Sequence, residues 1–375
     1  MAELLTEKEL LDRLRTGQLS LPPLRFEVVK IDAGKRDDNG WDLLLDASWE
    51  SQRARFAAEC KSRSTPKAFE EAVRRSQDAK LPPRSLAMIV LPYLRESQLV
   101  ELERRGISGI DLCGNGVVVV PGKFSVFRTG GENRFPSYAP IKNIYRRNTS
   151  MVGRALLANP VFQSVQDVRK FVNNRNPLVT RWGKTPMGLG TVSKALKGLE
   201  DDLTVDRREG VRLLQAEKLI DNLQENYEPP RTVRRVRMKV EIGKRSLSQL
   251  LRKTANAANL PVVATGLSSV SRYAVMQREN VLSVYCPRSR PLQERLAGKE
   301  TDRFPNVELI ETDDQPPYFD ARDEQGFPWA SPLQTYLELM AGDKRDRETA
   351  EQVRDCLLRQ TGAGESVHSR SERRR

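Results

Sequence analysis

Hydrophobic and polar positions alternate with two different periods over the first 135 residues of the chain. Leucines at helical spacing predict a helix over residues 3–16, and period-two alternation predicts strands over 25–31, 41–50 and 53–61. The pattern continues with a helix at 64–77, a strand at 86–94, a helix at 96–106 and two strands joined by a turn at 107–120, and residues 122–131 close the domain. The order α-β-β-β-α-β-α-β-β predicts a mixed α/β domain over residues 1–135.

After an irregular stretch at 130–148, which we interpret as a linker, the periodicity becomes mainly helical. The pattern predicts helices at 150–160, 164–174, 190–203 and 216–227 and a β-hairpin at 204–214. Three helices followed by a two-stranded wing are typical of the winged helix-turn-helix. We therefore predict a winged helix-turn-helix DNA-binding domain over residues 146–230.

The connection between the second and third of these helices is unusually long. A helix-turn-helix turns in 3–4 residues, whereas about 15 residues separate the two predicted helices here. The loop is expected either to add a DNA contact or to make the recognition helix dock unusually.

The last third of the chain mixes both periods. It predicts a strand and a helix within 239–260, a strand end at 261–266, a helix at 268–275, strands at 281–287 and 306–312, and helices at 331–340 and 347–360. We expect a C-terminal α/β domain over 231–361 and a disordered basic tail over 362–375. The basic run 231–239 fits a strand or a linker near DNA phosphates equally well.

Charge singles out the middle of the chain. The 375 residues carry a net charge of +13, and residues 146–260 alone hold 23 basic and 11 acidic residues. A localised surplus of this kind is the footprint of nucleic-acid binding. The other interpretation is a solvated basic face without a partner.

Composition excludes several kinds of chemistry. The only histidine is His368, and four widely spaced cysteines form no CxxC pair. Ser-His-Asp catalysis and histidine-ligated metals are thereby excluded, so any chemistry must use carboxylates, lysines, hydroxyls or a hard metal ion. The sequence has no apolar run of about 18 residues and no secretion signal. It predicts a cytoplasmic protein that does not span a membrane.

One candidate site lies in the N-terminal domain. Asp42 opens a predicted strand, and Glu59 and Lys61 share one face at the end of the next strand. Two carboxylates and a lysine can hold one Mg²⁺ and orient a water for phosphodiester attack. Glu9 and Asp12 of the first helix are possible further ligands. The pattern Asp-x₁₆-Glu-x-Lys, in this order of elements, resembles the PD-(D/E)xK restriction-endonuclease-like fold. The alternative is an ordinary sheet that carries a surface ion pair.

A second candidate site lies in the winged helix. Val192, Ala195, Leu196 and Leu199 fall at core spacing in the third helix. This arrangement leaves polar side chains outward that can reach bases and phosphates. The candidate DNA-binding residues are Thr191, Ser193, Lys194 and Lys197 in the helix, Arg207 and Arg208 in the wing, and Arg181 and Lys184 in the preceding loop. The alternative is a protein-binding adaptor.

Together these segments resemble the AbiEi family of antitoxins and transcriptional regulators of type IV toxin-antitoxin systems. The resemblance covers roughly residues 40–345. Its most specific elements are the Gly-Ile-x-x-Ile-Asp-Leu-x-Gly-Asn segment at 106–115 and the Thr-Val-Ser-Lys helix, whereas segments 264–275 and 331–339 fit more loosely.

The resemblance implies binding of double-stranded DNA at the operon's own promoter, without any cofactor. It also implies that the protein counters a nucleotidyltransferase toxin and catalyses no reaction itself. The rival hypothesis is an endonuclease of the PD-(D/E)xK type, targeted by the winged helix, in which Asp42 and Glu59 bind Mg²⁺ and Lys61 acts on the transition state.

Overall fold

The computed structural model describes residues 5–31, 41–135, 143–242, 246–275 and 281–361. The chain forms two compact units, Met1–Lys142 and Asn143–Arg375. Within the second unit we call residues 143–230 the middle segment and residues 231–361 the C-terminal segment. The predicted tail at 362–375 lies outside the described residues. Among the residues described, no helix is long and apolar enough to cross a membrane.

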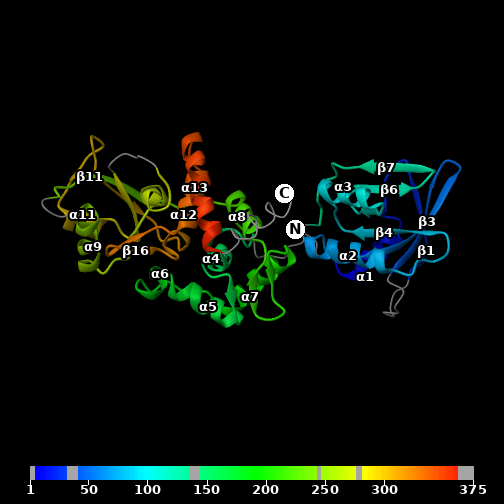
Figure 1. Ribbon diagram of the computed structural model, residues 1–375, viewed down its shortest axis with the longest axis horizontal. Coiled ribbons are helices and arrows are strands. Elements are labelled where there is room, and N and C mark those ends of the chain that lie inside the picture. The colour runs from blue at the N-terminus through cyan, green and yellow to red at the C-terminus, as the bar shows by residue number, and fades with distance from the viewer. Residues whose placement is uncertain (1–4, 32–40, 136–142, 243–245, 276–280, 362–375) are drawn as a thin grey trace, which may run out of the picture. The chain divides into compact units, whose positions relative to one another are not determined.

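The first unit has the predicted order of elements followed by one further strand, β7, and the expectation of a mixed α/β fold is confirmed (Figure 1). Its elements are α1 (Glu7–Arg15), β1 (Arg25–Ile31), β2 (Leu43–Trp49), β3 (Gln52–Cys60), α2 (Pro66–Asp78), β4 (Ser85–Leu91), α3 (Glu96–Arg105), β5 (Ser108–Asp111), β6 (Gly116–Val120) and β7 (Phe124–Arg128). The seven strands form one sheet in chain order. The β3–β4 and β4–β5 pairs are parallel, because α2 and α3 cross over between them, and the other pairs are antiparallel.

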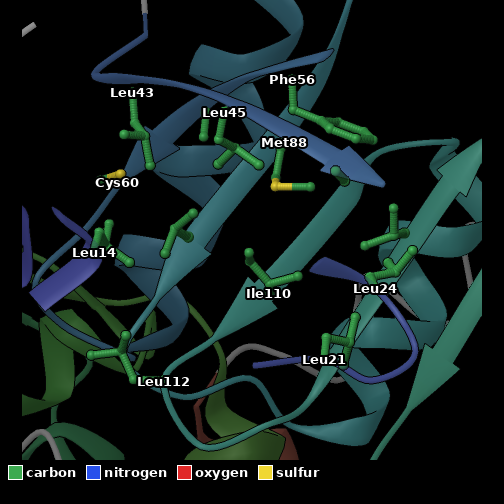
Figure 2. Packing of buried hydrophobic residues seen from close by; sticks show 14 of the residues in the cluster. Leu14, Leu21, Leu24, Leu43, Leu45, Phe56, Cys60, Met88, Ile110 and Leu112 are labelled. Carbon is green, nitrogen blue, oxygen red and sulfur yellow. The ribbon is translucent and has the colours of Figure 1, made fainter. Parts of the chain in front are cut away.

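This sheet is buried on both faces. The register pairs Leu43 with Ala58 and Leu45 with Phe56, so these side chains share one face and pack with Leu14 of α1. Figure 2 shows this cluster, with Met88 and Ile110 from β4 and β5 at its centre. The other face packs against α2 and α3. Both faces therefore need apolar side chains, which explains the continuous apolar run of β4.

The 106–115 segment closes the unit through a buried carboxylate. Asp111 accepts hydrogen bonds from the backbone N–H groups of Leu94, Cys113 and Asn115, at 2.8–2.9 Å, and from the Asn115 side chain at 2.7 Å. Asn115 Oδ1 in turn accepts from the N–H of Gly131 at 2.7 Å. The motif thus joins the β5–β6 turn to the start of α3 and to the end of the unit.

The middle segment consists of helices around a small sheet. Its elements are α4 (Ser150–Ala158), β8 (Val161–Phe162), α5 (Val165–Asn174), α6 (Pro177–Thr180), α7 (Leu189–Asp201), β9 (Val205–Asp206), β10 (Val211–Leu213) and α8 (Ala216–Glu225). The strands lie in the order β8-β10-β9, and all pairs are antiparallel. The four long helices and the hairpin were predicted. Strand β8 and helix α6 were not.

The C-terminal segment is built on a five-stranded sheet of order β12-β13-β15-β11-β14. Its strands are β11 (Arg234–Lys239), β12 (Val263–Ala264), β13 (Leu282–Cys286), β14 (Lys299–Glu300) and β15 (Val307–Glu311), with a separate hairpin of β16 (Arg322–Glu324) and β17 (Phe327–Trp329). The helices are α9 (Leu247–Ala257), α10 (Gly266–Ser269), α11 (Arg290–Leu296), α12 (Pro332–Met340) and α13 (Lys344–Gln360).

Two predictions for this segment were wrong. The first strand runs over Arg234–Lys239, earlier than the strand predicted from residue 239 onward. The helix predicted at 268–275 is reduced to the single turn of α10 and the short 3₁₀ helix Val270–Arg272.

A buried polar chain joins the middle and C-terminal segments. Arg154 of α4 donates to Gln334 Oε1 of α12 at 2.7 Å, and Gln334 Nε2 donates to Glu338 Oε1 at 2.9 Å and to the hydroxyl of Tyr227 at 3.2 Å. Burial lowers the pKa of Arg154 to about 10, so its guanidinium is charged at neutral pH. Because an unpaired buried charge is costly, these hydrogen bonds hold α4 firmly against α12.

Candidate nucleic-acid interface and acidic cluster

The structure brings Asp42, Glu59 and Lys61 together at one edge of the first unit. Asp42 immediately precedes β2, and its backbone N–H donates to the carbonyl of Ala58 at 2.9 Å. Its carboxylate accepts from the N–H of Cys60 at 2.8 Å. The Glu59 side chain, 1% exposed, forms an ion pair of 2.7 Å with Lys61. Continuing the antiparallel register by one residue places Asp42 opposite Glu59, whose carboxylate reaches Arg75 of α2.

The electrostatics of this cluster are unusual for surface residues. Burial, followed by the negative charges of Glu59 and Glu7, raises the pKa of Asp42 to about 6, against the opposing hydrogen bond from Cys60. Glu7 of α1 is therefore the acidic residue of the first helix whose charge reaches this cluster. Glu9 instead caps its own helix by accepting from the backbone N–H of Thr6 at 2.7 Å.

A second cation occupies this cluster, which the sequence did not predict. Arg75 of α2 donates to Glu59 Oε1 at 3.2 Å, so this oxygen is shared by Arg75 and Lys61. The second oxygen, Glu59 Oε2, is buried and has no hydrogen-bond partner. Within the described residues, no group of three or more His, Cys, Asp or Glu side chains could hold a metal ion.

The second candidate site centres on α7. Val192, Ala195, Leu196 and Leu199 are buried, as their spacing predicted. The opposite side of the helix is accessible: Lys194 and Lys197 are exposed, and Thr191 and Ser193 are partly exposed. Helix α7 therefore presents a polar, hydroxyl- and lysine-bearing surface beginning in its first turn.

Ion pairs divide the predicted DNA-binding cations into two groups. Lys197 pairs with Asp201 at 3.0 Å and Glu200 at 3.4 Å, Arg207 with Glu200 at 3.8 Å, and Arg208 with Asp206 at 2.8 Å. Arg181 and Lys194, both exposed, have no ion pair with any residue that the structure describes. Lys194 and Arg181 are therefore the two cations of this set that can meet a phosphate without first leaving a carboxylate.

The hairpin turn after β9 depends on Gly210. This residue has φ of +90°, and a Cβ atom there would lie 2.7 Å from the carbonyl oxygen of Phe162 in β8. Glycine therefore permits both the left-handed turn and the close approach of β8. The turn projects Arg208, whose side chain is 85% exposed.

The long loop between α5 and α7 packs on the C-terminal segment. We call residues 175–184 the strap, because they follow α5, pack on the C-terminal segment and lead back to α7. Leu178 of α6 is fully buried in a cluster with Val263, Tyr285, Ile310 and Tyr318. Lys184, predicted to bind DNA, forms an ion pair with Asp313. Sequence reasoning could not identify these partners, because they lie more than 80 residues away along the chain.

The basic run 231–239 forms strand β11 over Arg234–Lys239, which agrees with the strand alternative. Arg235 and Arg237 both pair with Glu308 of β15, at 3.2 and 3.0 Å, and Arg234 lies 4.0 Å from Glu300 of β14. Residues 231–260 hold nine basic residues and one acidic residue, whereas residues 146–230 hold 14 and 10. Most of the central surplus of charge thus belongs to the C-terminal segment rather than to the helices around α7.

Comparison with protein families gives one match. Residues 212–359 match the model of a family described as a transcriptional regulator, the AbiEi antitoxin of type IV toxin-antitoxin systems. The match begins in β10 and ends in α13, so it covers the C-terminal segment and leaves out α7 and the first unit. The segments that resembled the family only loosely in sequence lie inside the match, and the two that resembled it most lie outside. Comparison with curated proteins and with solved structures gave no match.

Proposed function

We propose that this protein is a DNA-binding transcriptional regulator of the AbiEi type, acting as the antitoxin of a type IV toxin-antitoxin system. The observation that carries the proposal is the family match over residues 212–359. On this proposal the protein binds double-stranded DNA at its own promoter and counters a nucleotidyltransferase toxin. It requires no cofactor for DNA binding.

We further propose that the middle segment is a winged helix whose recognition helix is α7. The order α4, β8, α5, α7, β9, β10 and the single antiparallel sheet support this assignment. The N-terminus of α7 favours a phosphate, and Thr191, Ser193 and Lys194 lie on the accessible side behind it. The hairpin turn with Arg208 would be the wing beside the DNA backbone.

A binding experiment on the DNA upstream of the protein's own gene tests the proposal. Retardation of a labelled duplex is followed over a salt series, because phosphate contacts make affinity fall as salt rises. Lys194→Ala with Lys197→Ala is expected to weaken binding well beyond tenfold without unfolding the protein. Lys299→Ala with Lys344→Ala removes two exposed lysines elsewhere and is the matched control. Equal binding by wild type and the α7 variant would show that α7 does not contact the DNA.

A metal-dependent endonuclease remains the second candidate function, because Asp42, Glu59 and Lys61 gather as that chemistry requires. Against it stands Arg75, whose guanidinium lies 3.2 Å from the same Glu59 oxygen that Lys61 contacts. The same duplex, incubated with Mg²⁺ or with EDTA, distinguishes the two functions. The regulator leaves the DNA intact in both conditions. Fragments that form only with Mg²⁺, and not with Lys61→Ala, would establish the enzyme.

We also propose that the first unit has the PD-(D/E)xK restriction-endonuclease-like fold. Its β1–β2–β3 meander, the crossover through α2 and the parallel β4 support this assignment. In the regulator the fold serves as a scaffold, with the ion pairs of Glu59 in place of a metal.

A further inference from the structure

The strap couples the C-terminal sheet to the start of α7. Figure 1 shows α6 at the end of α5, toward the elements of the C-terminal segment. Its contacts run along the whole strap. Arg175 pairs with Asp320 at 2.6 Å, Asn176 donates to Gln315 at 3.0 Å, and the guanidinium of Arg288 lies 5.3 Å from the ring centre of Trp182.

Leu178 is the apolar anchor of this contact. One face of the C-terminal sheet packs with α9 and α11, whereas Tyr285 and Ile310 lie on the opposite face. Leu178 covers these two side chains and is itself 0% exposed. Burial of a leucine side chain stabilises such a contact more than an exposed ion pair like that of Lys184 does.

From the strap, the chain leads directly to α7. The N–H of Lys184 donates to the carbonyl of Leu178 at 2.9 Å, which folds the end of the strap back on α6. Three residues later, Met187 is held from both sides by Asn173 of α5: its N–H donates to Asn173 Oδ1 at 2.8 Å, and its carbonyl accepts at 3.1 Å. Helix α7 begins at Leu189. The start of α7 therefore has two supports, one from α5 and one from the C-terminal segment.

We propose that the C-terminal segment sets the position of α7 on DNA through this strap, with Leu178 as a positioning residue that touches no DNA. This inference rests on the proposed function, because it concerns how α7 meets a promoter. It assigns the long loop a role that is neither a DNA contact nor a simple linker. If releasing the strap leaves α7 in its binding orientation one tenth of the time, the apparent affinity falls tenfold.

The test uses the full chain with Leu178→Ala and the DNA upstream of its gene. Promoter affinity is expected to fall about tenfold, with the affinity for unrelated DNA unchanged, because the cations of α7 remain while their alignment is lost. The conservative Leu178→Met is expected to restore binding, since it keeps the volume of the side chain. Leu251→Ala opens a comparable cavity in α9, on the other face of the sheet, and is expected to keep promoter affinity.

Three outcomes would overturn the inference. Unchanged promoter affinity in Leu178→Ala would show that the strap does not position α7. An equal loss in Leu251→Ala would show that the effect is general destabilisation. A wild-type protein that binds no promoter DNA would refute the proposed function, and this inference with it.

A second variant keeps the test open if Leu178→Ala melts below the assay temperature. Asp313→Asn with Asp320→Asn removes the ion pairs that Lys184 and Arg175 of the strap make, without opening a cavity. It is expected to lower promoter affinity selectively as well.

Discussion

At the scale of single residues, local sequence identified the candidate site side chains but not the oppositely charged residues that pair with them. The strand period placed Glu59 and Lys61 on one face, and Asp42 joined them as predicted. The ion pair of Arg75 with Glu59 was missed, because Arg75 lies on α2 and its position in that helix predicts an ordinary solvent-facing arginine. The ion pair of Lys184 was missed for the same reason, since Asp313 lies 129 residues further along the chain.

Asp42 predicts a characteristic pH dependence of stability. Burial raises its pKa from 3.8 to about 6, so the folded chain keeps a proton that the unfolded chain has released. The stability contributed by this carboxyl is therefore greatest below about pH 4 and falls as pH rises toward 6. Asp42→Asn keeps an oxygen for the N–H of Cys60 and removes the titration. We expect the variant to gain stability relative to wild type between pH 4 and 6, measured by urea unfolding. Parallel pH profiles would contradict the assigned burial.

Lys194 and Lys184 are predicted to differ in DNA binding although both are lysines near α7. Lys194→Ala should lower the slope of log affinity against log salt by about one, as the loss of one phosphate contact does. Lys184→Ala should change the slope little, because its charge is already paired with Asp313. Retardation assays at four or five salt concentrations measure both slopes. A larger loss of slope in Lys184→Ala than in Lys194→Ala would show that the strap contacts DNA.

At the scale of elements, long periodic segments were predictable and short ones were not. The four long helices of the middle segment were found because each keeps apolar residues at helical spacing over nine residues or more. Strand β8 has two residues and α6 four, which is too short for any period. Strand β11 was ambiguous because its arginines are satisfied by Glu308, more than 70 residues away. Elements held by distant partners carry no local signal.

The hairpin after β9 gives a prediction at this scale. Gly210→Ala should destabilise the protein by about 1 kcal/mol or more, because alanine disfavours a φ of +90° and its Cβ would meet the Phe162 carbonyl. Gly190→Ala, in the first turn of α7 with open space around its Cβ, should instead stabilise by up to about 1 kcal/mol. Thermal melting of the two variants measures the difference. Equal shifts would show that the turn is not constrained by β8.

At the scale of the whole molecule, the distribution of charge alone was misleading. The basic surplus of the central region suggested one nucleic-acid-binding module, but much of it lies in β11 and α9, where carboxylates neutralise several of the arginines. Net charge along the sequence counts residues and ignores pairing. The positive charge available to a polyanion is therefore smaller than the count implies, in the middle segment as well, where Lys197, Arg207 and Arg208 are paired with carboxylates.

The buried chain from Arg154 through Gln334 to Glu338 has a consequence for how the second unit comes apart. Opening the contact between α4 and α12 would break the buried hydrogen bonds that Gln334 makes to both segments, so neither segment can unfold without destabilising the other. The middle and C-terminal segments should therefore unfold together, in one cooperative transition. Hydrogen exchange should show equal protection for the slowest amides of α4 and α12, reduced in both by Gln334→Ala. Unequal protection in the wild type would show two independent folding units.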